Sequence, residues 1–254
     1  MICIPIVAEG TAPAVELMER AAPLADLFEF RIDRMRDLDL ERLLAARRIP
    51  VIVTNRRREE GGGFPGTEEE RVALLLAAAR LRADYVDIET ETDPALKEEL
   101  RRVCLQSGTK RISSWHDFSG TPPEALLKRK LAALIADDAD IVKIATHAGD
   151  AADGLRILEL IPCARQKGQA VIAFCMGETG RISRIIAPLL GSAISYAPLE
   201  LEGASAPGQL TADRMRVILH ALRDQFPAAE YFLDAQPCGN VPAKQERETA
   251  RECA

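Results

Sequence analysis

The chain has 254 residues, 47% of them hydrophobic and 28% charged, which is the composition of a globular protein with a full core. Its formal net charge of −6 and its 4% of aromatic residues disfavour nucleic-acid binding, which needs a basic surface and stacking platforms. The apolar run from Met1 to Ala8 is far too short for a membrane span and has no basic segment before it. We therefore expect a cytoplasmic protein with no nucleic-acid partner and no membrane partner.

The six cysteines are dispersed along the chain and form no C-x-x-C pair. This pattern suits neither a zinc site nor the disulfide scaffold of a small secreted domain. We expect most of them to be reduced core thiols, and we expect no metal site. The six are Cys3, Cys104, Cys163, Cys175, Cys238 and Cys253.

Short segments rich in β-branched residues alternate with segments of helical periodicity along almost the whole chain. Eight of the short segments predict strands, and each is followed by a candidate helix. The predicted strands are Ile2 to Val7, Leu27 to Ile32, Pro50 to Thr54, Asp84 to Glu89, Arg111 to Trp115, Asp140 to Ala145, Val171 to Cys175 and Ala193 to Tyr196.

The clearest predicted helix runs from Thr67 to Leu81, where three glutamates favour the positive amino end and an apolar stripe follows. Eight alternating βα units at this length predict an α/β fold, a single (β/α)8 TIM barrel over residues 1–234. An open doubly wound sheet is the alternative, although no G-x-G-x-x-G follows the first strand. Residues 235–254 are polar and lack periodic hydrophobic residues, so we expect a flexible C-terminal tail.

Charged residues occur inside several predicted strands, where a parallel barrel should be apolar. Glu29, Arg31 and Asp33 recur at the two-residue period of a strand and so point the same way. In an antiparallel sheet this row would be an exposed face, but in a sheet buried on both faces it favours a charged cluster at the carboxyl-end mouth of a barrel. Arg56 at the end of strand three and Asp87 in strand four continue this pattern.

Two residues stand out as candidates for chemistry. His116 follows strand five beside a carboxylate, where a general acid or base is expected, whereas His147 and His220 look like a loop residue and a solvated helix residue. Lys143 is centred in an apolar strand, although lysine is rarely buried. It either extends to the barrel rim or is a desolvated amine that attacks a carbonyl.

The chain contains, in order, the segments FEFRID, TNRRREEGG, SWHDF, VKIAT, MGETGRISR and SAPGQ. Together they resemble the type I 3-dehydroquinate dehydratase family, the Schiff-base enzymes of the shikimate pathway, over roughly Ile4 to Gln209. The resemblance implies a (β/α)8 barrel, a homodimer, and no metal or organic cofactor. It also implies that the small-molecule substrate is 3-dehydroquinate, which is dehydrated to 3-dehydroshikimate.

The resemblance also assigns roles to residues. Lys143 would form the imine, His116 would be the general base and acid, and Asp87 would orient His116. Asp33 and Glu60 would support the site. Substrate contacts are implied for a larger set, which consists of Glu29, Arg31, Arg56, Met176, Arg184, Ser205 and Gln209.

Among these contacts, Arg184 would pair with the substrate carboxylate, and Ser205 and Gln209 would close over it. Without the resemblance, the two loops that hold these residues could each be an ordinary loop. Three positions depart from the family pattern, namely Asn55, Arg57 and Arg58. Asn55 stands where an aromatic residue or cysteine is common, and the two arginines make the loop more basic.

Two alternatives remain at this point. A class I aldolase or transaldolase is another barrel with a strand lysine and imine chemistry, so the fold and Lys143 alone do not separate the two activities. His116 together with Arg184 favours dehydration. The second alternative is a catalytically silent homologue with a binding role, which the presence of all three residues disfavours.

Overall fold

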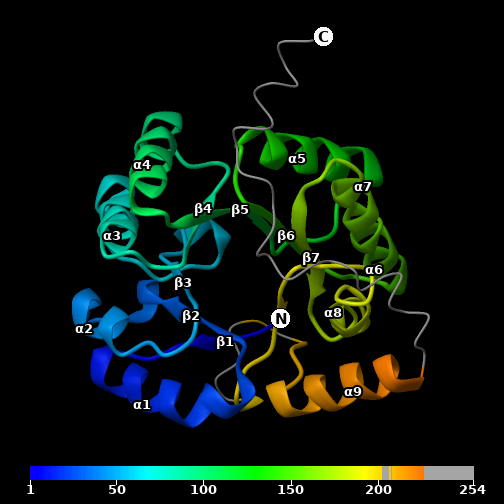
Figure 1. The fold of residues 1–254 in the computed structure, drawn as a ribbon. Coiled ribbons are helices and arrows are strands. Elements are labelled where there is room, and N and C mark those ends of the chain that lie inside the picture. Colours follow the sequence, from blue (N-terminus) through cyan, green and yellow to red (C-terminus); the bar gives the residue numbers. More distant parts are fainter. Residues whose placement is uncertain (202–205, 207, 226–254) are drawn as a thin grey trace.

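The computed structural model describes residues 1–201, 206 and 208–225. In this part of the chain, an eight-stranded parallel sheet curls into a barrel that is surrounded by helices (Figure 1). The strands are β1 (Ile2–Ile6), β2 (Leu27–Arg31), β3 (Val51–Thr54), β4 (Tyr85–Glu89), β5 (Lys110–Asp117), β6 (Ile141–His147), β7 (Ala170–Met176) and β8 (Ser195–Tyr196). The helices are α1 (Thr11–Ala21), α2 (Leu40–Ala45), α3 (Glu68–Arg80), α4 (Pro94–Ser107), α5 (Glu124–Ala136), α6 (Ala151–Leu158), α7 (Leu160–Gln166), α8 (Arg181–Ile186) and α9 (Ala212–Gln225).

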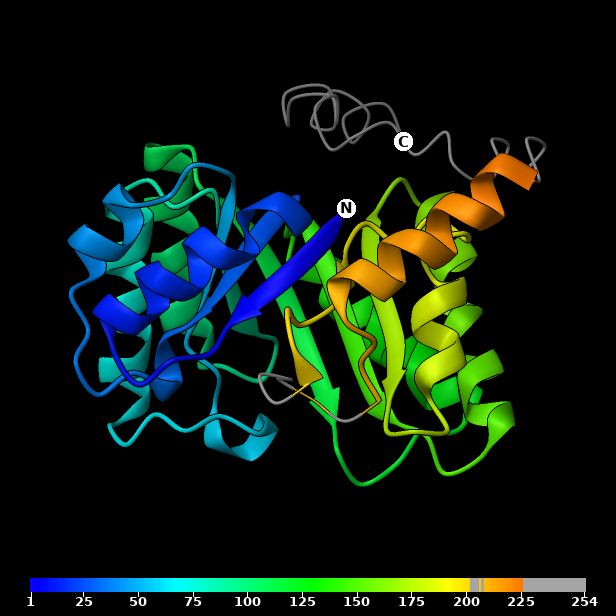
Figure 2. The same ribbon diagram turned by 90° about the horizontal axis from the view of Figure 1, so that it is seen from below.

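Each strand from β2 to β7 pairs in parallel with the strand before it, and β8 pairs in parallel with β1. At the remaining seam, the Ala193 N–H donates to the Val171 carbonyl at 2.8 Å. The helices α1 to α4 cover one side of the barrel and α6 to α9 the other (Figure 2). The predicted (β/α)8 barrel is confirmed, and the open-sheet alternative is wrong.

Local sequence explains where the elements begin and end. Helix α3 starts with a capping box, in which the Thr67 side chain accepts the Glu70 N–H while the Glu70 carboxylate accepts the Thr67 N–H. The predicted helix over this segment is confirmed. Strands β5 and β6 run past their predicted ends to Asp117 and His147, because the ladder register continues through these polar residues.

The barrel interior has two halves, and both are built from every second residue of the strands. We call the end at which the strands begin the amino half; it is apolar, and its side chains include Leu27, Ile52, Tyr85, Ile112, Ile141, Ile172 and Ile194. We call the other end the carboxyl half; its side chains include that of His116, which is 9% exposed, and those of the buried residues Glu29, Thr54, Arg56, Asp87, Glu89, Ser114 and Lys143. The polar residues are therefore concentrated at the end of the barrel that the sequence indicated.

Within the described residues, no helix is both long and apolar enough to cross a lipid bilayer. The predicted boundary between barrel and tail at residues 234 and 235 lies outside the described residues.

Candidate active site

Lys143 lies at the centre of the carboxyl half, and its side chain is only 5% exposed. Its Nζ contacts Asp87 Oδ2 at 3.2 Å, the Tyr196 hydroxyl at 3.2 Å and Glu29 Oε1 at 3.5 Å. Strand β6 turns this side chain inward, because Ile141 and Ala145 on either side of it also belong to the interior cluster. The lysine is thus buried within the barrel and does not extend to its rim.

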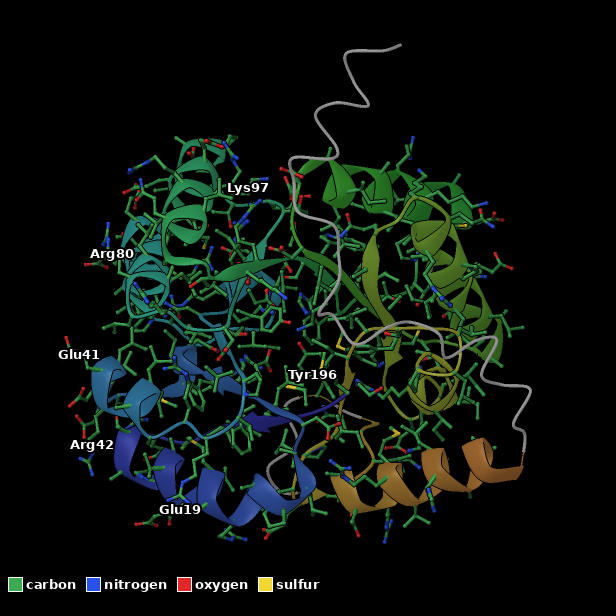
Figure 3. The ribbon with its side chains drawn as sticks, viewed as in Figure 1. Glu19, Glu41, Arg42, Arg80, Lys97 and Tyr196 are labelled. Carbon is green, nitrogen blue, oxygen red and sulfur yellow. The ribbon has the colours of Figure 1, made fainter. Side chains whose placement is uncertain are left out.

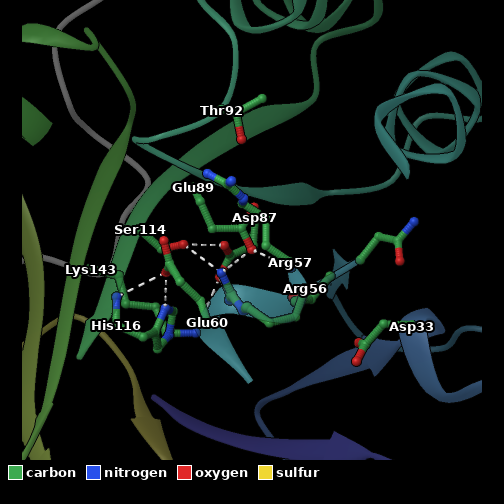
Figure 4. A network of polar contacts seen from close by, with 12 residues as sticks. Asp33, Arg56, Arg57, Glu60, Asp87, Glu89, Thr92, Ser114, His116 and Lys143 are labelled. Carbon is green, nitrogen blue, oxygen red and sulfur yellow. Dashed lines mark hydrogen bonds and ion pairs between the residues drawn. The ribbon is translucent and has the colours of Figure 1, made fainter. Parts of the chain in front are cut away.

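Arg56 connects the two carboxylates of β4. Its guanidinium donates to Asp87 Oδ2 at 2.7 Å and to Glu89 Oε1 at 2.6 Å, and also to the Ser114 hydroxyl at 2.7 Å. Ser114 in turn donates to Asp87 Oδ1 at 2.6 Å, as Figure 4 shows. Burial alone would raise the pKa of Asp87, but Arg56 and Lys143 hold it well below its ordinary value. Asp87 is therefore ionised throughout the neutral pH range.

His116 is held by Glu60, which comes from the loop after β3. Glu60 Oε2 lies 2.9 Å from His116 Nδ1 and accepts the main-chain N–H of His116 at 2.9 Å (Figure 4). Burial, and then the cations Arg56 and Lys143, lower the pKa of His116 well below its ordinary value. Burial raises the pKa of Glu60 to about 8 although Arg56 opposes this rise. At neutral pH the imidazole is thus uncharged.

The structure shows no hydrogen bond among the described residues between His116 and Asp87, the residue predicted to orient it. In the described residues, the hydrogen-bonding side chains of Asp87 are Arg56, Ser114 and Lys143, and the position beside the imidazole belongs to Glu60. Asp87 points toward the barrel axis from β4, whereas the loop after β3 folds back over the barrel mouth and reaches the histidine. This folding requires Gly62, because a Cβ there would lie 1.8 Å from the Arg56 carbonyl oxygen.

The charged residues of β2, Glu29 and Arg31, are also satisfied, as is Asp33, which lies not in the strand but in the 3₁₀ turn that follows it (Ile32–Arg34). Arg31 forms a two-pronged ion pair with Asp33, with Nε and NH2 at 2.9 and 3.0 Å from the two carboxylate oxygens. Asp33 also accepts the main-chain N–H of Gly63 at 3.0 Å. Glu29 accepts the Thr54 hydroxyl at 2.9 Å in addition to its contact with Lys143. All three charged residues predicted from this strand are therefore buried at the barrel mouth.

The expected carboxylate-binding arginine approaches from α8. The Arg184 guanidinium carbon lies 4.3 Å from the centroid of the Phe174 ring, and burial lowers the pKa of Arg184 to about 10. Met176 and Gln209 are both buried, and the Gln209 side chain accepts the main-chain N–H of Ala206 at 3.4 Å. Arg184 is still a cation at neutral pH. Ser205 lies outside the described residues.

Several residues of the site were not among the predicted set. Glu89 shares the inward face of its strand with Asp87, as the two-residue period indicates, but it was given no role in the site; Ser114 lies two residues before His116, where the same period could have identified it. Tyr196 ends the shortest strand, which gave little pattern to interpret. Arg71, which pairs with Glu89 Oε2 at 2.8 Å, comes from α3, and no sequence signal connected that helix with the barrel interior.

The three positions that depart from the family pattern surround the site, and the main-chain N–H of Arg57 donates to Glu89 Oε1 at 3.1 Å. The Asn55 side chain donates to the Arg71 carbonyl at 3.0 Å and thus ties the end of β3 to α3. Arg57 is paired with Glu59 at 3.4 Å, and Arg58 is exposed. His147 and His220 lie elsewhere, the former against Gly177 and the latter exposed on α9. Among the described residues, no group of three or more His, Cys, Asp or Glu could hold a metal ion.

Comparison with known proteins agrees with this arrangement. The chain is 36% identical over 222 residues to a 3-dehydroquinate dehydratase of Pyrococcus abyssi, which covers 87% of this chain and 98% of that protein. It is 38% identical over 228 residues to that of Syntrophobacter fumaroxidans, covering 86% and 95% of the two chains.

A crystal structure of 3-dehydroquinate dehydratase from Geobacillus kaustophilus superposes with a TM-score of 0.81 at 32% identity, covering 88% of this chain and 91% of that chain. The sequence model of the type I 3-dehydroquinase family matches residues 2–225. This match spans almost the whole described barrel, including Lys143, His116 and Arg184. The chain therefore belongs to the type I 3-dehydroquinase family.

Proposed function

We propose that this protein dehydrates 3-dehydroquinate to 3-dehydroshikimate, a hydro-lyase reaction of the shikimate pathway, through an imine on Lys143. The observation that carries the proposal is the buried amine of Lys143 within reach of two carboxylates and beside a neutral imidazole, in a member of this family. Lysine is costly to bury, so a lysine at this position is better explained by chemistry than by folding.

The steps follow from the groups present. The Lys143 amine adds to the ketone, and loss of water leaves a protonated imine that withdraws electrons from the neighbouring carbon. His116 removes a proton from that carbon, and the resulting enamine expels the hydroxyl group one carbon further on. His116 returns its proton to this leaving group, which departs as water. Hydrolysis of the imine then releases the product and restores the amine.

His116 is suited to this work by its protonation state. Its lowered pKa leaves the imidazole neutral and able to accept a proton. Because Glu60 Oε2 faces both the main-chain N–H and Nδ1, we infer that Nδ1 donates to it and that Nε2 is the basic nitrogen. Glu60 thus acts as the positioning residue that the sequence-based interpretation assigned to Asp87.

Asp87 has a different proposed role, next to the nitrogen of the imine. It is ionised and lies 3.2 Å from Lys143 Nζ, so it stabilises the positive charge that Nζ carries as ammonium and again as protonated imine. Arg56 and Ser114 hold this carboxylate in place from the other side. The cation therefore never faces an apolar environment during the reaction.

Substrate binding is assigned to the residues around this centre. Arg184 would pair with the substrate carboxylate, and Gln209 and Ser205 would contact the same end of the molecule. Glu29 and Arg31 would bind ring hydroxyl groups, with Asp33 holding Arg31. Met176 would line the pocket, and Arg56 would contact the substrate while it holds the carboxylates of β4.

Borohydride reduction in the presence of 3-dehydroquinate, followed by peptide mass spectrometry, tests the proposal. We expect a stable adduct on Lys143 and formation of the conjugated enone of the product, seen as ultraviolet absorbance. Lys110→Ala is the matched control, because this lysine lies at the opposite end of the barrel beside Tyr85 and should leave the adduct unchanged. An unmodified Lys143 in folded protein, or retro-aldol turnover without enone formation, would contradict the proposal.

We also propose a homodimer in the cytoplasm. Exposed Leu155 on α6 and Ile182 on α8 support association, because these two helices pack together and present both side chains to solvent. Cys3, Cys104 and Cys175 are unpaired and buried, as expected in a reducing compartment. Analytical ultracentrifugation should give twice the chain mass, and a monomeric protein that retains full activity would contradict the dimer.

A further inference from the structure

Two aromatic side chains lie together in the barrel interior, on either side of the seam between β7 and β8. Phe174 of β7 and Tyr196 of β8 have ring centroids 6.1 Å apart, with an angle of 52° between the ring planes. Both are buried, and Tyr196 lies in the middle of the molecule within the ring of helices (Figure 3). We call these two residues the aromatic pair.

Each ring of the aromatic pair carries one cation. Lys143 Nζ lies 4.2 Å from the centroid of Tyr196, and the guanidinium carbon of Arg184 lies 4.3 Å from that of Phe174. Both cations are buried, so these contacts are desolvated, and cation–π attraction is strongest under that condition. A continuous series of contacts thus runs from Lys143 across the two rings to Arg184.

Tyr196 also contacts Lys143 through its hydroxyl, at 3.2 Å from Nζ. The other two oxygen atoms near Nζ belong to carboxylates that accept further hydrogen bonds, from Arg56 to Asp87 and from Thr54 to Glu29. Burial raises the pKa of Tyr196, so its hydroxyl keeps its proton. The phenol can therefore donate to a free amine, which an ionised carboxylate such as that of Asp87 cannot.

We propose that the aromatic pair is a positioning element that fixes the separation between the Lys143 amine and the Arg184 guanidinium. It thereby selects ketones whose carboxylate lies at the matching distance. This inference rests on the proposed function, since the reaction there assigns the ketone to Lys143 and the carboxylate to Arg184. Within the pair, Tyr196 directs the amine and Phe174 supports the guanidinium.

Because Tyr196 contacts Lys143 and Phe174 contacts Arg184, two conservative variants should have different kinetic effects. Tyr196→Phe keeps the ring and removes the hydroxyl, so borohydride trapping and kcat should slow about tenfold while KM changes less than about twofold. Phe174→Leu keeps an apolar side chain and removes the ring beneath Arg184, so KM should rise about tenfold while trapping at saturating substrate stays near the native rate.

Phe174→Leu should also reduce selectivity. The native enzyme should prefer 3-dehydroquinate strongly over the same cyclic ketone without its carboxylate, measured as a ratio of kcat/KM. In Phe174→Leu this ratio should fall about tenfold, whereas Tyr196→Phe should leave it unchanged. A purely structural role for the two rings would not separate kcat from KM in this way.

Each variant has a matched control. Tyr85→Phe removes the hydroxyl of another buried tyrosine beside a lysine, but in the amino half. Phe30→Leu truncates a buried phenylalanine of β2 that belongs to the apolar core shared with the surrounding helices, which includes Leu43 and Leu75. Both controls should keep native kcat, KM and selectivity, even where they lower the thermal unfolding midpoint.

The outcomes are distinguishable. If the native protein is trapped on Lys143 and both variants of the aromatic pair retain native kcat, KM and selectivity, the inference is overturned and the proposed function stands. The inference is also overturned if Tyr85→Phe changes the kinetics as much as Tyr196→Phe does, and Phe30→Leu as much as Phe174→Leu does. If the native protein forms no adduct on Lys143, the proposed function fails and this inference fails with it.

Discussion

The amino and carboxyl halves of the barrel interior are built from the same strands, yet they contain opposite kinds of side chain. On β6, Ile141 lies in the apolar amino half, and Lys143, two residues further on, lies among carboxylates. On β4 the same step leads from Tyr85 to Asp87. The amino half resembles any packed core, so it accounts for folding, while the carboxyl half contains groups that folding alone would not select.

The carboxyl half is tolerated because its charges compensate one another. Asp87 lies between Arg56 and Lys143, and Glu89 lies between Arg56 and Arg71. Such buried networks roughly balance the desolvation of their members, and removing one member leaves an uncompensated charge. The comparison teaches that changes in the first half lower stability alone, whereas changes in the second lower activity and, where one member of a charge network is removed, stability as well.

The largest effect should come from Lys143→Ala. Without the amine no imine can form, so we expect turnover of 3-dehydroquinate to fall by a factor on the order of 10⁴ or more. The measurement is enone formation at high enzyme concentration, with circular dichroism as a control for folding. Turnover close to the native rate would mean that the two halves do not differ in function as described.

His116→Ala should have the next largest effect. Loss of a general acid–base group costs about 10²- to 10⁴-fold in rate, so we expect kcat to fall within that range. The amine is intact in this variant, and borohydride should still trap an adduct on Lys143, although more slowly. Near-native dehydration would remove the acid–base role, and a complete absence of adduct would place His116 in imine formation itself.

Ile141→Ala tests the amino half on the same strand as Lys143. Ile141 is 1% exposed, and truncation of a buried isoleucine to alanine costs about 2–5 kcal/mol of unfolding free energy. Urea denaturation should show this loss, while kcat per folded molecule stays within about twofold of native. If kcat per folded molecule falls well beyond twofold, the division between the two halves is not valid.

The narrowest effect is the pH dependence contributed by Glu60, because it concerns a single proton. Its pKa is about 8 in the folded protein against an ordinary value of 4.5, so between these pH values the folded chain retains a proton that the unfolded chain releases. The stability that this proton gives is fully present below pH 4.5 and is lost as pH rises through about 8. Glu60→Gln has no such proton, and its amide oxygen can still accept from His116.

The unfolding free energy of Glu60→Gln, measured relative to native, should therefore rise by about 1.4 kcal/mol per pH unit within this window. Urea titrations at pH 5, 6, 7 and 8 would measure it. Taking the difference between the two proteins at each pH cancels the contributions of groups that do not interact with Glu60. A difference that stays constant from pH 5 to 8 would show that Glu60 is ionised throughout.

Much of this architecture was predictable from the sequence because barrel strands repeat a simple pattern. The period of two placed Glu29 and Arg31 on one face, and apolar neighbours marked Lys143 as unusual. The partner of His116 was not predictable in this way. Glu60 follows a strand by several residues, and its position depends on a loop whose path is set by the close approach of Gly62 to Arg56.

The aromatic pair was unpredictable for a different reason. Phe174 and Tyr196 look like ordinary core residues in the sequence, and their importance arises from the cations placed over them. Those contacts join β6 to β8 and α8 to β7, and no local pattern encodes them. Periodicity therefore identifies which side chains face inward, while the contacts among them depend on the closed barrel.

The seam between β7 and β8 affects the local opening of the barrel wall. Strand β8 has only two residues. Among the described residues, the segment around β8 is connected to β7 by the hydrogen bond from the Ala193 N–H to the Val171 carbonyl, and to β1 by parallel pairing. Thermal fluctuations should open this short edge before the longer ladders, and Tyr196 would move with it. A ketone covalently joined to Lys143 would pack against the Tyr196 ring, so formation of the imine would reduce the local opening at β8.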